Sequence, residues 1–241
     1  MKHRLIIVEG LPCAGKSTVA AGIAAHLGDR AVCVDEGTGD HPADYECHAL
    51  TEAGDVVSLA ELPQEERERL LPRKIYDGLP WETEAPLMLD KWRQFVRSAD
   101  SGRAYVFNCV LLQNPMCETM MRFDLPEAAS AAHIRAISEI IAPMNPLVVY
   151  LRTQDVAALV RRAAPRRPGW LEAVIPYHTE GGYGRAVGAE GFDGYIRCLE
   201  ERQAREMRIL QQLPLASLVL DAPSEAGKID VDGIAAQITG E

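Results

Sequence analysis

The chain has 241 residues, of which 47% are hydrophobic, and this is enough to bury a large core within one α/β domain. Asp and Glu number 35 against 25 Lys and Arg, so the formal net charge is −10. This acidic balance disfavours general binding to nucleic acids or to anionic membranes. Any bound phosphate must therefore be held by a local site.

The cysteines and the apolar runs exclude several classes of protein. The six cysteines form no CxxC pair and no spaced Cys/His cluster, so neither a zinc site nor a disulfide framework is expected. The apolar run from Arg4 to Val8 is too short for the core of a secretory signal, and no run approaches the roughly 20 residues of a membrane-spanning helix. These features predict a cytoplasmic protein without membrane or nucleic-acid partners, and they leave homodimer formation open.

Five apolar segments are typical of buried strands and alternate with helical patterns. The predicted strands are 5–8, 31–34, 104–112, 147–151 and 215–220. The predicted helices are 16–27, 64–71, 86–96, 126–141, 154–162, 190–212 and 229–238. This alternation predicts an α/β fold with a parallel sheet covered on both faces. Signals in 37–62 are mixed and favour loop, and the glycine-rich run 180–194 follows no strand, which indicates a mobile loop.

The first predicted strand and helix enclose a phosphate-binding motif. The segment from Gly10 to Ser17 fits the pattern GxxxxGK[ST], in the strand-to-helix context that the motif needs. Backbone N–H groups of such a loop, with the positive end of the following helix, surround nucleotide phosphates. Lys16 would reach the β and γ phosphates, and Ser17 would ligate Mg²⁺. The predicted nucleotide-binding residues are Gly10, Cys13, Ala14, Gly15, Lys16, Ser17 and Thr18.

The run IIVEGLPCAGKST resembles the opening of the thymidylate kinase and deoxynucleoside kinase group of P-loop kinases. The specific match covers about the first twenty residues, and Cys13 stands where that loop often has glycine. The resemblance implies a P-loop NTPase three-layer sandwich, with a five-stranded parallel sheet and an arginine-bearing lid segment after the fourth strand. It also implies transfer of the γ-phosphate of ATP, or of GTP, to a small acceptor in the presence of Mg²⁺.

On this resemblance, residues 1–241 form a single kinase-like domain, with an acceptor-side helical region at about 40–100 and a lid at about 161–190. The lid segment carries four arginines and prolines that stop a helix. In similar kinases such a segment closes over the donor and neutralises charge on the transferring group. Arg161 and Arg166 are therefore predicted to be catalytic, and Arg162 and Arg167 to bind nucleotide. A solvated basic face at a helix end is the alternative interpretation.

Acidic residues end the second predicted strand, at the edge where functional groups gather in an open α/β sheet. Deoxynucleoside kinases that resemble this chain place an acidic residue there, near the acceptor hydroxyl. Glu36 is therefore the predicted base, with Asp35 and Asp40 left open for that role. Asp35, Asp40 and His41 are also predicted to line the acceptor site. A charged turn without function is the competing interpretation.

The third predicted strand ends without a carboxylate. Motor ATPases and many other P-loop hydrolases finish this strand with Asp or Asp-Glu, whereas this chain offers Asn108, Gln113 and Asn114. Amides recognise an acceptor better than they serve ionic catalysis, so Asn108 and Gln113 are predicted to bind substrate. Amides that simply cap a strand end are the alternative.

These features together predict an ATP-dependent small-molecule kinase. The acceptor would be a nucleoside, a nucleotide or another alcohol such as a sugar, an antibiotic or a metabolic intermediate. The alternative is a P-loop ATPase, or a nucleotide-binding regulatory protein, without a phosphoryl acceptor. The missing strand-end acid disfavours the ATPase, and the lid arginines disfavour a module without turnover.

Overall fold

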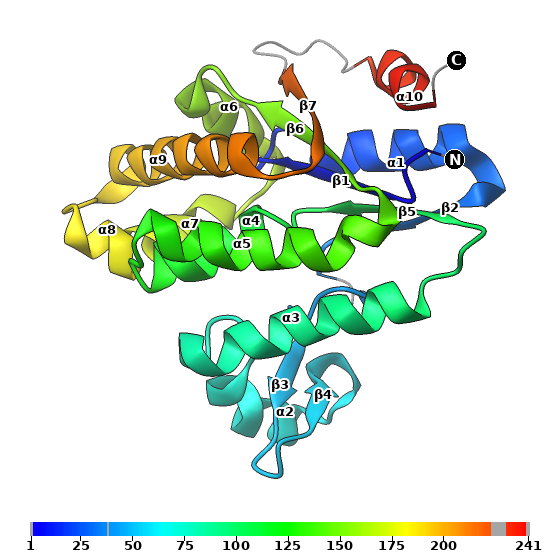
Figure 1. Ribbon diagram of the computed structural model, residues 1–241. Coiled ribbons are helices and arrows are strands. Elements are labelled where there is room, and N and C mark those ends of the chain that lie inside the picture. Colours follow the sequence, from blue (N-terminus) through cyan, green and yellow to red (C-terminus); the bar gives the residue numbers. More distant parts are fainter. Residues whose placement is uncertain (1, 38, 223–229, 240–241) are drawn as a thin grey trace.

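The computed structural model describes residues 2–37, 39–222 and 230–239. Its centre is a five-stranded sheet in which every neighbouring pair is parallel, with the strand order β2-β5-β1-β6-β7 (Figure 1). The strands are β1 (Leu5–Gly10), β2 (Ala31–Val34), β5 (Ala104–Asn108), β6 (Leu147–Arg152) and β7 (Ala216–Asp221). The predicted five-stranded parallel sheet is confirmed.

Successive residues of the central strand serve two separate cores. Ile6 and Val8 pack with α1 (Lys16–Leu27) and α10 (Val231–Thr239) on one face of the sheet. Leu5 and Ile7 pack on the other face with three helices, α3 (Trp81–Ser98), α5 (Glu127–Ile141) and α9 (Gly191–Gln212). Side chains of a strand point alternately to the two faces of the sheet. A sheet that is covered on both faces therefore requires apolar residues at successive positions of the strand. The three-layer arrangement predicted from the sequence is thereby confirmed.

Most helices begin and end close to their predicted bounds. Helices α1, α2 (Gln64–Leu70), α5, α6 (Val156–Ala163) and α9 agree within about two residues. Helix α3 begins at Trp81, five residues before the predicted start, because Pro86 lies inside the helix rather than at its first turn. The predicted start of the last helix, at residue 229, lies outside the described residues.

Three segments differ from the sequence-based expectation. Strand β5 ends at Asn108 instead of continuing to residue 112, because Cys109 adopts a left-handed φ of 70° and turns the chain toward α4 (Gln113–Met116). The segment 37–62 contains an antiparallel hairpin of β3 (His48–Leu50) and β4 (Val56–Ser58), which lies beside α2 and α3 in Figure 1.

The prediction of a mobile loop at 180–194 is wrong. This segment contains α8 (Gly182–Ala186) and the first turn of α9, and it follows α7 (Trp170–Thr179). A Cβ on Gly184 would lie 2.3 Å from the carbonyl oxygen of His178, so here glycine serves close packing of backbone on backbone. None of the helices within the described ranges is both long and apolar enough to cross a membrane.

Candidate functional site

The loop from β1 to α1 follows a path that favours glycine at three positions. Gly10 has a φ of 139°, and a Cβ there would lie 2.6 Å from the carbonyl oxygen of Leu151 on β6. Gly15 has a φ of 97°, and Cys13 has a φ of 69°. Cys13 therefore adopts a left-handed conformation that glycine reaches more easily, at a cost of roughly 1–2 kcal/mol. The loop keeps a tight turn at this position without a glycine.

Lys16 and Ser17 begin α1 directly behind this loop. Lys16 is almost fully buried, and its Nζ donates a hydrogen bond to the carbonyl oxygen of Leu11 at 2.9 Å. This bond holds the ammonium group against the inside of the loop and leaves two of its three donors available. Ser17 is exposed at the mouth of the helix, and its Oγ accepts a hydrogen bond from Asn108 Nδ2 at 3.0 Å.

Asn108 connects helix α1 with the loop after β2. It is fully buried at the end of β5, and its Oδ1 accepts a hydrogen bond from the backbone N–H of Glu36 at 3.0 Å. Both polar atoms of this amide are thus engaged within the protein. This geometry matches the strand-end alternative and not the predicted contact with substrate.

Glu36 and Gln113 form the other wall of the site. Gln113 Nε2 donates a hydrogen bond to Glu36 Oε2 at 3.0 Å. Glu36 is exposed, so its carboxylate is open to the pocket. The amide restricts the carboxylate to one orientation while leaving its other oxygen for a second partner.

A buried carboxylate that the site prediction missed supports this wall. Glu9 Oε1 accepts hydrogen bonds from the backbone N–H groups of Leu111 and Leu112 at 2.8 and 2.9 Å, and its Oε2 accepts one from Gln113 at 3.2 Å. Complete burial raises the pKa of Glu9 to about 7, and the negative charge of Glu206 adds to the rise, although the three backbone donors oppose it. An acidic residue directly before Gly10 was the available sequence signal.

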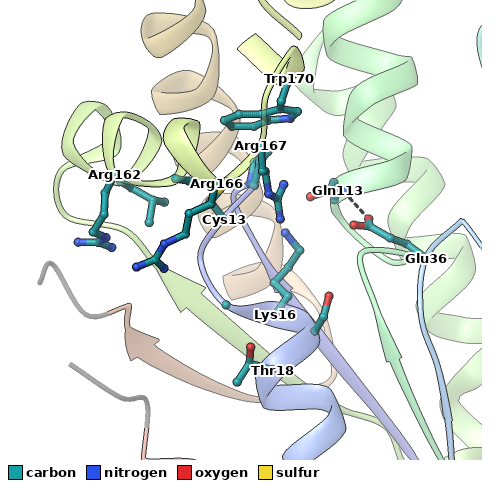
Figure 2. A pocket seen from close by; sticks show the side chains of 14 residues that line it. Cys13, Lys16, Thr18, Glu36, Gln113, Arg162, Arg166, Arg167 and Trp170 are labelled. Carbon is teal, nitrogen blue, oxygen red and sulfur yellow. Dashed lines mark hydrogen bonds between the residues drawn. The ribbon is translucent and has the colours of Figure 1, made fainter. Parts of the chain in front are cut away.

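One pocket of about 490 Å³ brings many, but not all, of the predicted site residues together. The P-loop forms its floor, and Figure 2 shows Arg162 and Arg166 on one side, with Glu36 and Gln113 on the other. Lys16 and Arg167 lie between the two sides. The pocket is lined by residues of the P-loop and α1, the two residues of the opposite wall, and the lid segment: Pro12, Cys13, Gly15, Lys16, Ser17, Thr18, Glu36, Gln113, Leu159, Arg162, Ala163, Arg166, Arg167 and Trp170.

Two features of the lid segment differ from the prediction. Arg161 does not line the pocket, because its guanidinium lies over the ring of Phe192 on α9, 4.8 Å from the ring centre. Trp170, which the sequence did not single out, does line it, and the Arg167 guanidinium lies 5.4 Å from its ring centre. Within the segment 161–170, the residues that line the pocket are therefore Arg162, Ala163, Arg166, Arg167 and Trp170.

The remaining predicted acceptor residues lie outside this pocket. Asp35 and Asp40 are exposed and do not line it. His41 is buried with its ring 4.6 Å from that of Phe107, and its Nδ1 accepts a hydrogen bond from the backbone N–H of Ala43. Burial, with a contribution from the charge of Lys91, lowers the pKa of His41 to about 4. His41 is thus a neutral packing residue near pH 7.

The donor set of the site suits a metal ion that arrives with a nucleotide. Within residues 2–37, 39–222 and 230–239, no group of three or more His, Cys, Asp or Glu side chains is placed to hold a metal ion. Mg²⁺ commonly keeps several water ligands and binds through substrate phosphates with few protein ligands. The exposed hydroxyl of Ser17, fixed by Asn108, fits the role of a single protein ligand of this kind.

No protein-family model and no curated protein sequence matches the chain. Among solved structures, the chain is similar to the YorR protein of Bacillus subtilis, in complex with phosphorylated GDP, at 16% identity and a TM-score of 0.47, over 98% of this chain and 94% of that one. It is also similar to a protein of Chloroflexus aurantiacus that carries a provisional assignment as a kinase, at 17% identity and a TM-score of 0.46, over 100% of this chain and 98% of that one. At this level of similarity, function has to be inferred from the side chains of the site.

Proposed function

We propose that the chain is a small-molecule kinase that transfers the γ-phosphoryl group of ATP or GTP to a hydroxyl group of its acceptor. The observation that carries this proposal is the single pocket that combines a P-loop, three lid arginines and a carboxylate. Phosphoryl transfer depends on positioning and on neutralising charge, and these three elements meet both needs.

The P-loop is the proposed site of the donor phosphates. The loop approaches the start of α1 with Gly15 in a left-handed conformation, so the first N–H groups of the helix are open to an anion. Lys16 holds one hydrogen bond to Leu11 and would direct its remaining donors at the β and γ phosphates. Ser17 Oγ is the protein ligand proposed for Mg²⁺, which, when bound, neutralises charge between the phosphates.

The arginines of the proposed lid segment are proposed to neutralise charge on the phosphoryl group while it is transferred. Arg162, Arg166 and Arg167 line the pocket together with the loop from β1 to α1, and Arg166 and Arg167 are exposed. A planar guanidinium can hold two oxygens of one phosphoryl group, which suits the charge that develops there. Arg161 is left out of this role because it packs on Phe192.

Glu36 is proposed to accept the proton of the acceptor hydroxyl. It lies on the pocket wall opposite Arg162 and Arg166, so an acceptor beside it would face the donor phosphates (Figure 2). Gln113 holds the carboxylate in place, which is how a positioned base gains efficiency. The proposed acceptor is a nucleoside, a nucleotide or another small alcohol.

The experiment that tests the proposal is an ADP- and GDP-release assay over a broad panel of hydroxyl-bearing acceptors. Each hit is checked by mass spectrometry for one added phosphoryl group. We expect nucleoside diphosphate release to depend on an acceptor that becomes phosphorylated. Release at the same rate with and without every acceptor would instead support a P-loop ATPase.

A further inference from the structure

Asn108 occupies a junction between three strands of the sheet. It is the last residue of β5 and lies opposite Val8 of β1, which leads into the P-loop, while Phe107 before it lies opposite Val34 of β2. Its side chain is fully buried between the two loops that follow β1 and β2. The loop after β1 leads directly to Ser17 at the start of α1, on the proposed donor side of the pocket, and the loop after β2 carries Glu36, on the proposed acceptor side.

The hydrogen bonds define which end of the amide faces which neighbour. The backbone N–H of Glu36 can only donate, so it must face Oδ1, at 3.0 Å. The Nδ2 group then faces Ser17 Oγ, also at 3.0 Å, and must donate to it. The hydroxyl of Ser17 therefore accepts with one lone pair, and its second lone pair and its proton remain available to other partners.

We infer that Asn108 is a positioning residue that holds the Ser17 hydroxyl toward Mg²⁺ and ties this hydroxyl to the backbone of Glu36. The inference rests on the proposed function, and it explains how the site works without a carboxylate at the end of β5. An uncharged amide orients the ligand but adds no negative charge beside the metal. The affinity for Mg²⁺ then comes mainly from the nucleotide phosphates.

The test compares three variants, Asn108→Ala, Asn108→Asp and Asn114→Ala. Asn114 is the matched control, because it is also a buried amide. Its Nδ2 donates to Asp44 Oδ2 at 3.0 Å and to neither Ser17 nor Glu36. Calorimetry with a non-hydrolysable nucleoside triphosphate analogue measures nucleotide affinity in EDTA and over a range of Mg²⁺ concentrations. Thermal unfolding of each variant is recorded without ligand.

Mg²⁺ should strengthen nucleotide binding, and the Mg²⁺ concentration at half of this effect is the quantity compared. We expect this concentration to be about tenfold higher, or more, in Asn108→Ala than in the unmodified protein. Loss of a group that orients a metal ligand usually has an effect of this size. Nucleotide affinity in EDTA should change by less than about threefold. Asn114→Ala should lower the melting temperature and leave the Mg²⁺ dependence unchanged. Equal Mg²⁺ dependence in Asn108→Ala and Asn114→Ala would overturn the inference.

Asn108→Asp keeps the test decisive if the alanine variant does not fold. A carboxylate can accept from both the Glu36 N–H and the Ser17 hydroxyl, and it adds a negative charge near the metal. We expect its Mg²⁺ requirement to fall below that of the unmodified protein, and an equal or greater requirement would contradict the inference. If the unmodified protein bound no nucleotide, the proposed function itself would be rejected. This result differs from one in which nucleotide binds but Asn108 has no effect on the Mg²⁺ dependence, which would reject the inference alone.

Discussion

Gln113 Nε2 lies 3.0 Å from Glu36 Oε2, and this hydrogen bond joins the start of α4 to the loop after β2. The backbone of Gln113 is held in turn by Glu9, the buried carboxylate at the end of β1. The orientation of the proposed base thus depends on a carboxylate that lies next to the P-loop. The strand that leads into the loop below the pocket therefore also supports the wall formed by Glu36 and Gln113.

Glu36→Gln removes the proposed base while preserving the size of the side chain. We expect kcat to fall by about 100-fold or more with nucleotide affinity unchanged, because a positioned general base contributes in this range. Asp35→Asn is the matched control, since Asp35 precedes Glu36 on the same loop but lies outside the pocket. Steady-state kinetics that show equal kcat for the two variants would remove the base role from Glu36.

Lys16→Ala removes the ammonium that the P-loop encloses. We expect kcat to fall by at least about 100-fold, because a preorganised donor to a developing negative charge has an effect of this size. The variant also loses the buried hydrogen bond to Leu11, so a loss of about 1 kcal/mol in the free energy of unfolding accompanies it. Circular dichroism shows whether the fold persists, and full activity in a folded variant would exclude the motif from the mechanism.

Arg166→Ala tests the lid, with Arg161→Ala as its control. Both residues are exposed arginines of one short segment, but Arg166 faces the P-loop, whereas Arg161 lies over Phe192. We expect kcat to fall more than tenfold for Arg166→Ala, about 1.4 kcal/mol, with a smaller change in nucleotide affinity. Arg166→Lys should recover only part of the loss, because it keeps the charge without the planar fork. Equal rates for the two alanine variants would contradict a lid role for Arg166.

Glu9 should impose a measurable pH dependence on stability. Its pKa is about 7 in the folded protein against an ordinary value of 4.5, so between these values the folded state keeps a proton that the unfolded state has lost. The contribution of Glu9 to the free energy of unfolding therefore falls as pH rises from 4.5 to 7, by at most about 1.4 kcal/mol per pH unit, and levels off above 7. Glu9→Gln removes this contribution.

Denaturant unfolding of both proteins between pH 4 and pH 8 measures the difference. We expect the stability of Glu9→Gln relative to the unmodified protein to rise through this window. A difference that stays constant with pH would show that folding leaves the pKa of Glu9 unchanged, contrary to the account.

The central sheet could be predicted because its strands are continuous apolar runs between helical patterns, a signal that each segment carries by itself. Helix α1 was predicted with its observed bounds for the same reason. The β3–β4 hairpin could not be predicted, because its strands have three residues each and are mostly half-buried. Pro86 suggested that helix α3 begins at that residue. Packing of the turn before Pro86 instead extends the helix to an earlier start, at Trp81.

In the site, too, features within one short segment could be predicted, whereas contacts between distant segments could not. The loop from β1 to α1 is one contiguous segment, so a local motif is enough to predict a phosphate-binding loop there. The roles of the two amides depend on contacts across 91 and 77 residues of chain, from Asn108 to Ser17 and from Gln113 to Glu36, which no local pattern contains. Likewise, only the packing of α6 against α9 decides that Arg161 turns away from the pocket while Arg162 faces it.

The most direct test of the account follows the γ-phosphoryl group itself. A nucleoside triphosphate with isotopically labelled γ-phosphate oxygens is incubated with the protein and an acceptor from the panel, and the label is traced by mass spectrometry. The account predicts that the labelled phosphoryl group appears on the acceptor in an amount equal to the nucleoside diphosphate released, and that Lys16→Ala abolishes both. Label found only in inorganic phosphate, whichever acceptor is present, would contradict a kinase.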